Sequence, residues 1–230
     1  MLVECVPNFS EGRDAGKIDA VVAAIRSERD VRVLHVDSGE AANRTVVTVV
    51  GEAESVLRAM RVGIKTAAGL IDMRSQSGTH PRIGTTDVCP FVPLQGSSMT
   101  DCISLAEQLG ERVGSELGIP VYLYARAARQ KNRVRLPSIR RGEYESLEDK
   151  MEQGFVPDYG PNVFNARSGA TVIGARPFLV AWNVNLNTKD VSLAREIARR
   201  LRTSGRLLPD GKRQPGRFRS LQADGWFIDE

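Results

Sequence analysis

Apolar and polar residues alternate with two different periods over the first 125 residues of the chain. Helical spacing of apolar side chains over 15–28 and 52–70 predicts two helices, and a third is expected over 100–117. Short apolar or β-branched runs, typical of strands, cover 2–6, 31–37, 44–50, 87–94 and 120–125. The order β-α-β-β-α-β predicts a split, ferredoxin-like unit with helices packed on one face of its sheet.

A second β-α-β pattern follows after residue 170. Strands are expected over 171–187 and 219–228, with a helix over 191–203 that Asp190 caps. The stretch between the two patterns, 154–169, is rich in Gly, Pro and Asn and predicts a loop, where binding groups tend to sit. We expect the second unit to be incomplete, because a full split unit needs roughly one more β-α-β half.

The composition narrows the class of protein. No apolar run approaches the roughly 20 residues that span a membrane, and the N-terminus lacks the features of a secretory signal. The cysteines are odd in number and widely spaced, which favours reduced thiols over a disulfide framework; they are Cys5, Cys89 and Cys102. Because the chain has only two histidines in addition to these cysteines, no metal site is expected. Reduced thiols also predict that the protein is located in the cytoplasm.

Arginine makes up 26 of the 32 basic residues, although the net charge is only +4. Guanidinium groups suit carboxylates and phosphates, but a GC-rich genome would produce the same bias. Two stretches, 129–141 and 195–219, are dense in arginine, as in nucleic-acid binders. Aromatic residues for base stacking are scarce around both, so we expect no nucleic-acid partner and no membrane partner.

The segment SGTHPRIGTTDVCP at 77–90 contains His80, which we expect to lie in a loop and not in a helix or strand. Pro81 biases His80 toward an extended conformation, and Gly78 and Gly84 let the loop bend sharply around it. Histidine titrates near neutral pH, with an unperturbed pKa of about 6.5. His80 is therefore a candidate general acid and base.

Three other residues near these motifs have competing interpretations. Cys89 could pair with His80 as a nucleophile, but its apolar strand favours a buried structural thiol. His35 and Asp37 share one face of a strand. We interpret His35 as a packed or edge histidine, and Asp37, just before a turn, as a candidate functional carboxylate. The chain has no dinucleotide-binding glycine motif, P-loop or nucleophile elbow.

Six motifs together resemble the formiminotransferase domain of the glutamate formimidoyltransferase family, in order and over essentially the whole chain. They are ECVPNFSEGR at 4–13, VDSG with NRTV at 36–46, HPRIGTTDVCPFVP at 80–93, PVYLY at 120–124, RRGEYE at 140–145 and GPNVFNARSGATVIGARPFLVAWNVNL at 160–186. The resemblance implies transfer of a formimino group from N-formimino-L-glutamate to N5 of tetrahydrofolate, the co-substrate. It also implies an α+β fold: two ferredoxin-like subdomains with mixed β-sheets facing each other across a folate tunnel and helices outside, in a homodimer.

The same resemblance assigns boundaries and roles. The N-terminal subdomain would cover 1–175, and a truncated second subdomain 176–230. His80 would be the catalytic residue. The chemistry of the donor adds two further roles: Asp37 would orient the cationic formimino group, and Arg44 or Arg82 would hold a carboxylate of the donor. The alternative for each arginine is a surface salt bridge. The folate-binding segment would comprise Gly160, Pro161, Asn162, Val163, Phe164, Asn165, Ala166, Arg167, Ser168 and Gly169.

The chemistry of transfer needs few groups. The acceptor N5 must lose a proton as it attacks, and the departing glutamate nitrogen must gain one, so a single group near neutral pKa suffices. No metal or redox cofactor is required. Because the second unit is expected to be incomplete, a catalytically inactive folate- or carboxylate-binding module stays open, with a nucleic-acid binder as a third hypothesis. Valine at Gly169 is expected to block folate while leaving the fold intact.

Overall fold

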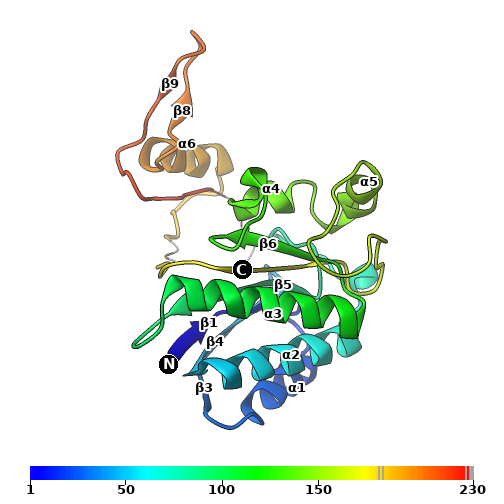
Figure 1. The fold of residues 1–230 in the computed structure, drawn as a ribbon. Helices are drawn as coiled ribbons and strands as arrows, with labels where there is room; N and C mark the ends of the chain where they lie inside the picture. Colours follow the sequence, from blue (N-terminus) through cyan, green and yellow to red (C-terminus); the bar gives the residue numbers. More distant parts are fainter. Residues whose placement is uncertain (181, 183, 226, 228–230) are drawn as a thin grey trace. The chain divides into compact units, whose positions relative to one another are not determined.

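The structure, a computed structural model, describes residues 1–180, 182, 184–225 and 227 (Figure 1). These residues form two compact units, which are described separately. The first is Met1–Leu179, and the second comprises the described residues from Val180 onward. None of the helices in the described ranges is long and apolar enough to cross a membrane.

The first unit mixes strands and helices. Its strands are β1 (Leu2–Cys5), β2 (Asn8–Phe9), β3 (Val31–Gly39), β4 (Arg44–Glu52), β5 (Thr86–Pro93), β6 (Val121–Ala125) and β7 (Thr171–Ala175). Its α-helices are α1 (Ala15–Arg26), α2 (Ala53–Leu70), α3 (Met99–Leu117), α4 (Leu136–Arg140) and α5 (Leu147–Glu152). Short 3-10 turns are η1 (Met73–Ser75), η2 (Lys131–Arg133) and η3 (Tyr144–Ser146). The expected α+β class is confirmed, as are the helices expected over 15–28, 52–70 and 100–117.

In the part of the chain that the structure describes, seven strands form one mixed sheet. β3 pairs with β4, and β1 and β2 lie one after the other between β4 and β5. These neighbours are antiparallel, with Val36 opposite Val47 in the β3–β4 pair. Beyond β5 the sheet continues through β7 to β6, and both added pairs are parallel. The loop expected over 154–169 thus leads into a central strand of the same sheet.

Helices α1, α2 and α3 cover one face of this sheet (Figure 1). The alternation in β4 explains this layer, because Thr45, Val47 and Val49 point into the core while the residues between them are half-buried. Two long helices, α2 and α3, bury one apolar stripe each. A capping box of Ser98 and Asp101 begins α3, where both side chains satisfy free backbone N–H groups.

The short helices α4 and α5 cover the other face at the β5–β7–β6 end. A second apolar cluster fills this layer, including Tyr122, Ile139, Met151 and Val172. At the β3–β4 end the same face carries half-exposed side chains, and His35 is exposed there. Helices of five and six residues contain too few turns to produce a helical pattern in the sequence.

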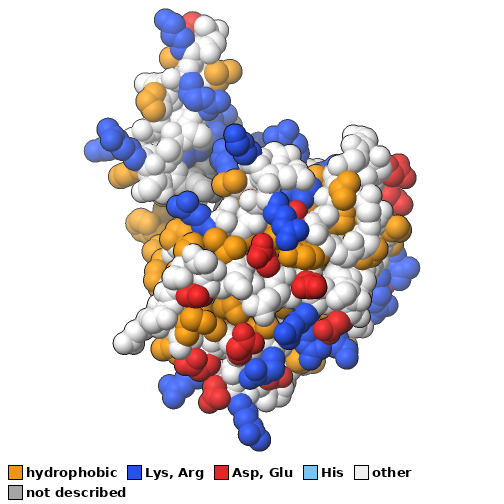
Figure 2. Space-filling model, viewed as in Figure 1, with side chains coloured by type: hydrophobic (Ala, Val, Ile, Leu, Met, Phe, Trp, Pro, Cys, Tyr) orange, Lys and Arg blue, Asp and Glu red, His pale blue; other side chains and the backbone are white. Residues whose placement is uncertain are grey.

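The second unit contains α6 (Val191–Leu201), β8 (Arg206–Leu207) and β9 (Arg213–Gln214). The predicted N-cap is confirmed, since Asp190 Oδ1 accepts the backbone N–H of Ser192 at 2.8 Å. Basic side chains gather around α6 and the β8–β9 hairpin (Figure 2). Glu196 pairs with Arg200 at 2.9 Å and Arg206 at 2.6 Å, so part of this charge is balanced.

In the described residues one expected strand is shorter than predicted and another is absent. The strand expected over 171–187 ends at Ala175, because residues 176–180 are irregular; residues 181 and 183 lie outside the described part. The strand expected over 219–228 is absent from 219–225, and 226 and 228 also lie outside. An apolar run alone does not make a strand, since a strand also needs a partner for its backbone groups.

The arginine-dense stretch 129–141 is partly structural. Arg133 is 1% exposed, and its Nη1 donates to Asp158 Oδ2 at 2.9 Å. Its guanidinium also lies over the rings of Tyr122 and Phe155, with centroids at 5.0 and 4.8 Å. Asp158 in turn accepts the backbone N–H of Leu123 in β6 at 2.8 Å. This buried ion pair therefore anchors the loop before β7 to the sheet.

Replacing Asp158 with asparagine should lower the free energy of unfolding by about 3–5 kcal/mol, the usual cost of leaving one charge of a buried pair uncompensated. The exposed Asp149 is the matched control, and D149N should change stability by less than about 0.5 kcal/mol. Urea unfolding of both variants measures the difference. Equal stability of D158N and D149N would contradict the anchoring role.

Candidate active site

The loop that carries His80 joins η1 to β5 and is packed closely from both sides. A side chain at Gly78 would come within 2.3 Å of the Ala42 carbonyl oxygen, and one at Gly84 within 2.1 Å of the Ala170 oxygen. Asn43 Nδ2 donates to the Ser77 carbonyl at 2.9 Å. The two glycines thus allow close backbone approach, and the loop is fixed beside the first residue of β4.

The hydrogen bonds of His80 define its tautomer. Its Nδ1 lies 2.8 Å from the Pro81 carbonyl oxygen, which can only accept, so Nδ1 carries the proton. Nε2 then holds the lone pair and accepts a hydrogen bond from Arg44 Nη1. Burial, followed by the charges of Arg44 and Arg140, lowers the pKa of His80 to about 4, although Asp87 opposes this. The imidazole is therefore neutral at pH 7.

Arg44 and Asp37 lie on one face of the β3–β4 hairpin. The register places Asp37 opposite Val46, next to Arg44 on the same face. Burial and the nearby Arg140 lower the pKa of Arg44, while Asp87 and Asp37 raise it. Asp37 itself is exposed. The structure thus brings together three of the residues that the sequence suggested: His80, Arg44 and Asp37.

Two charged residues of this cluster were missed by the sequence analysis. Asp87, at the start of β5, has a side chain only 1% exposed and forms an ion pair with Arg140 of α4. Its Oδ1 accepts the Ile83 N–H at 3.0 Å and Arg140 Nε at 3.3 Å. The sequence did contain a signal for this pair, because Asp87 lies in a strand that is otherwise apolar. A carboxylate buried there requires a cation as its partner.

Arg82 does not join the cluster. Its contacts are salt bridges, as in the alternative expected for it, although Arg82 is buried and not at the surface. Its Nη1 donates to Glu143 at 2.9 Å, and its Nη2 donates to Glu145 at 2.6 Å. Nη2 also donates to the Gln76 carbonyl at 2.8 Å. Because Glu143 and Glu145 belong to the RRGEYE motif, this motif fixes the His80 loop.

The segment 160–169 has an exposed beginning and a buried end. Val163 is 69% exposed, whereas Ser168 is 5% exposed and Gly169 is buried. Gly84 and Gly169 form a β-bridge, and the Ser168 carbonyl accepts the Thr85 N–H at 2.9 Å. The last two residues of the segment therefore attach it to the His80 loop.

The expectation that valine at Gly169 leaves the fold intact is wrong. Gly169 has a φ of +64°, which favours glycine. A Cβ there would lie 2.1 Å from the Ile83 carbonyl oxygen. Backbone cannot yield as a side chain can, so the substitution would disturb the packing of the loop.

The remaining candidates are structural. Cys89 lies in the core on the α1–α3 side, with its Sγ 3.4 Å from Cys5 Sγ, and burial raises the pKa of Cys5 well above its usual range. The hypothesis of a Cys89–His80 nucleophile pair has no support in this arrangement. His35 is exposed on the edge strand β3, which matches the edge interpretation.

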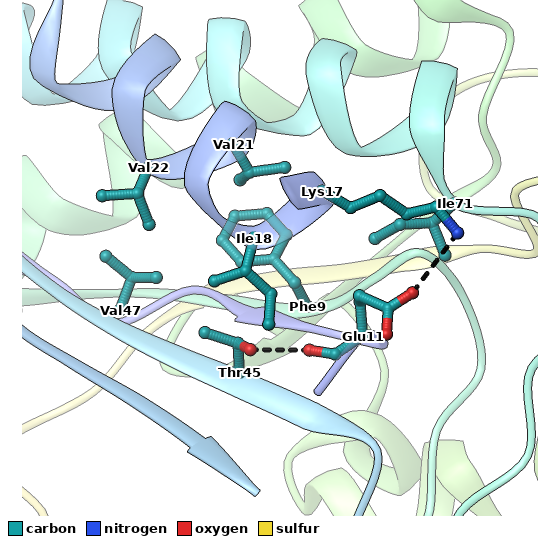
Figure 3. A pocket seen from close by; sticks show the side chains of 9 residues that line it. All are labelled: Phe9, Glu11, Lys17, Ile18, Val21, Val22, Thr45, Val47 and Ile71. Atoms are coloured by element: carbon teal, nitrogen blue, oxygen red, sulfur yellow. Dashed lines mark hydrogen bonds and ion pairs between the residues drawn. The ribbon is translucent and has the colours of Figure 1, made fainter. Parts of the chain in front are cut away.

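One small cavity lies on the helix-covered side of β4 (Figure 3). Its volume is about 10 Å³, room for about one water molecule. Glu11 and Lys17 lie beside Phe9 and Ile18 in its lining, and they form an ion pair at 3.6 Å. This cavity is too small for a substrate. Within the described ranges no group of three or more His, Cys, Asp or Glu side chains is placed to hold a metal ion.

Residues 2–176 match the model of the formiminotransferase domain, N-terminal subdomain, and residues 181–230 match that of the formiminotransferase domain.

Known relatives are similar over most of the chain. A glutamate formimidoyltransferase of Thermoplasma acidophilum is 48% identical over 204 residues, 87% of this chain and 67% of the relative. One of Streptococcus pyogenes is 42% identical over 205 residues, 89% of this chain and 69% of the relative. A formimidoyltransferase-cyclodeaminase of Rattus norvegicus is 49% identical over 231 residues, 100% of this chain. The chain spans 42% of that relative's length, and it belongs to the formiminotransferase family.

Proposed function

We propose that this chain transfers the formimino group of N-formimino-L-glutamate to N5 of tetrahydrofolate. The names of the Thermoplasma and Streptococcus relatives support this reaction. The observation that carries the proposal is His80, a neutral imidazole whose Nε2 lone pair faces the Arg44 guanidinium. The His80 imidazole is a base, and the Arg44 guanidinium beside it can bind an anion. Transfer from a donor that carries carboxylates needs both groups.

His80 would move one proton in two steps. As N5 attacks the formimino carbon, N5 becomes cationic, so its proton is acidic enough for a weak base to remove. His80 Nε2 accepts this proton, and the C–N bond to glutamate then breaks as the same proton passes to the glutamate nitrogen. The Nδ1–H bond to Pro81 at 2.8 Å keeps the ring oriented throughout.

Arg44 is the better candidate for a donor carboxylate. Arg82 is already bound by two glutamates and a carbonyl oxygen, whereas Arg44 contacts the neutral His80. Asp37, exposed on the same face as Arg44, would orient the cationic formimino group through charge attraction.

We assign folate binding to the exposed part of the segment 160–169. Its first residues offer an exposed valine and backbone amides, which suit a flat ring with polar edges. Tyr144 OH donates to the Ala166 carbonyl at 2.5 Å, and Arg167 Nη2 donates to the Gly69 carbonyl at 2.8 Å. These bonds hold the segment in place for a ligand.

We also propose the finer architecture that the family implies. The N-terminal subdomain would cover 1–175 and the second would begin at Arg176, each ferredoxin-like, in a homodimer with a folate site between facing sheets. The strand order β3-β4-β1-β5, which is that of a split β-α-β unit, supports the first assignment. Three buried free thiols favour the cytoplasm as the location.

Replacing His80 with alanine should lower kcat about 10²–10⁴-fold, the usual contribution of a positioned general acid and base. The affinity for 5-formyl-tetrahydrofolate and the melting temperature should change little, because His80 is only half-buried. Loss of N-formimino-L-glutamate that depends on tetrahydrofolate measures the rate. Exposed His35 is the control, and H35A should keep both rate and stability. Near-normal turnover of H80A would rule out the role.

Replacing Val163 with serine should weaken binding of 5-formyl-tetrahydrofolate about tenfold, because burying an apolar side chain of this size contributes about 1.5 kcal/mol. Fluorescence titration gives the Kd. Val156 is the matched control, since it is 47% exposed in the same loop but lies before the proposed folate segment. V156S should bind like the unsubstituted chain. Equal Kd values for V163S and V156S would place the folate elsewhere.

A further inference from the structure

Arg44 is a half-buried cation with little to hold it. Within the described residues its guanidinium makes one hydrogen bond, from Nη1 to His80 Nε2. A guanidinium has five N–H donors in a fork that matches a carboxylate. The neutral imidazole of His80 accepts from one of these N–H groups and does not balance the positive charge of Arg44. In the described part of the chain no carboxylate is therefore hydrogen-bonded to Arg44.

Arg140 stands close to Arg44 and is held rigidly. Asp87 binds Arg140 through two N–H groups, Nε at 3.3 Å and Nη2. In the described part of the chain Arg140 Nη1 makes no hydrogen bond. Its charge is near enough to lower the pKa of both Arg44 and His80. Asp87 thus pairs with Arg140, whereas among the described residues Arg44 forms no ion pair and has only the charge of exposed Asp37 near it besides that of Asp87.

We propose that Arg44 and Arg140 together bind one carboxylate of the donor, and that this carboxylate takes the Arg44 hydrogen bond away from His80 Nε2. The identity of the donor rests on the proposed function. Arg140 would touch the substrate, and Asp87 would be a positioning residue that aims Arg140. The ligand class is a dicarboxylate with the five-carbon spacing of glutamate.

Binding of the carboxylate would also prepare the base. In this structure the Nε2 lone pair accepts a hydrogen bond from Arg44 and so cannot accept the N5 proton. The bound carboxylate frees the lone pair and neutralises part of the charge around the ring. The charged groups facing His80 are Arg44 of β4, Arg140 of α4 and Asp87 of β5, with Asp37 of β3 beyond Arg44. An added negative charge beside them raises the pKa of His80.

The first test uses the unsubstituted chain and glutarate, an inert dicarboxylate. NMR titration of the two histidines from pH 3 to 8, with and without saturating glutarate, reports the ring pKa values. The His80 pKa should rise by about one unit or more on binding, as expected for an added opposite charge, while the ring signals of His35 should not respond to glutarate. Glutaramide, the neutral analogue, should have no effect. An unchanged His80 pKa at saturating glutarate would overturn the proposal.

The second test separates Arg140 from its neighbour. Arg140→Lys keeps the charge for Asp87 but loses the fork, so the Kd for glutarate and the KM for the donor should rise about tenfold or more. The KM for tetrahydrofolate should stay unchanged in R140K. A variant that had lost its fold would also lose its affinity for tetrahydrofolate. Arg141→Lys, at the exposed adjacent residue, is the control. Wild-type glutarate affinity in R140K would count against the clamp.

The two tests distinguish this proposal from the proposed function. If glutarate shifts the His80 pKa but no formimino transfer occurs, the carboxylate clamp is confirmed and the proposed reaction is wrong. If transfer occurs at a normal rate without any shift, the reaction stands and the clamp is overturned.

Discussion

A carboxylate buried at the start of a central strand constrains how the site is built. The side chain of Asp87 is 1% exposed, and an unpaired buried charge costs several kcal/mol, so a cation must lie against it. Arg140 meets this need from α4, and the Ile83 N–H adds a further donor. Because Arg140 can reach Asp87 only when α4 lies over the sheet, the ion pair fixes the segment after β6 beside the His80 loop.

The rest of the site depends on this placement. The residues that follow Arg140 bind Arg82 through two glutamates, and the Tyr144 hydroxyl binds the segment that we assign to folate. One short stretch of chain therefore holds both the His80 loop and the proposed folate segment. Burial, followed by the charges of Arg44 and Arg140, lowers the pKa of His80 and keeps its imidazole neutral, and the two positive charges favour anions. Both proposed substrates carry carboxylates, which suits such a site.

Local patterns in the sequence were enough for the elements with a clear period, such as α2 and β4, and for the bent loop around His80. They indicated a strand from residue 171 but not its end at Ala175. Nor did they show that β7 joins the first sheet, because its own residues do not specify the strands on either side of it. The sequence also did not show which of Arg44 and Arg82 is held in salt bridges and which is available to a ligand. Both are arginines in family motifs, and only the folded chain shows that glutamates 61 and 63 residues away occupy Arg82.

The proposed reaction depends on His80 being a neutral base with its proton on Nδ1. Nitrogen-15 NMR of the two histidine rings tests this directly, with H35Q assigning the signals. At pH 7, Nε2 of His80 should give the shift of an unprotonated nitrogen and Nδ1 that of a protonated one. The ring should stay neutral until the pH falls to about 4. A proton on Nε2 at pH 7, or an imidazolium already at pH 6, would rule out this role for His80.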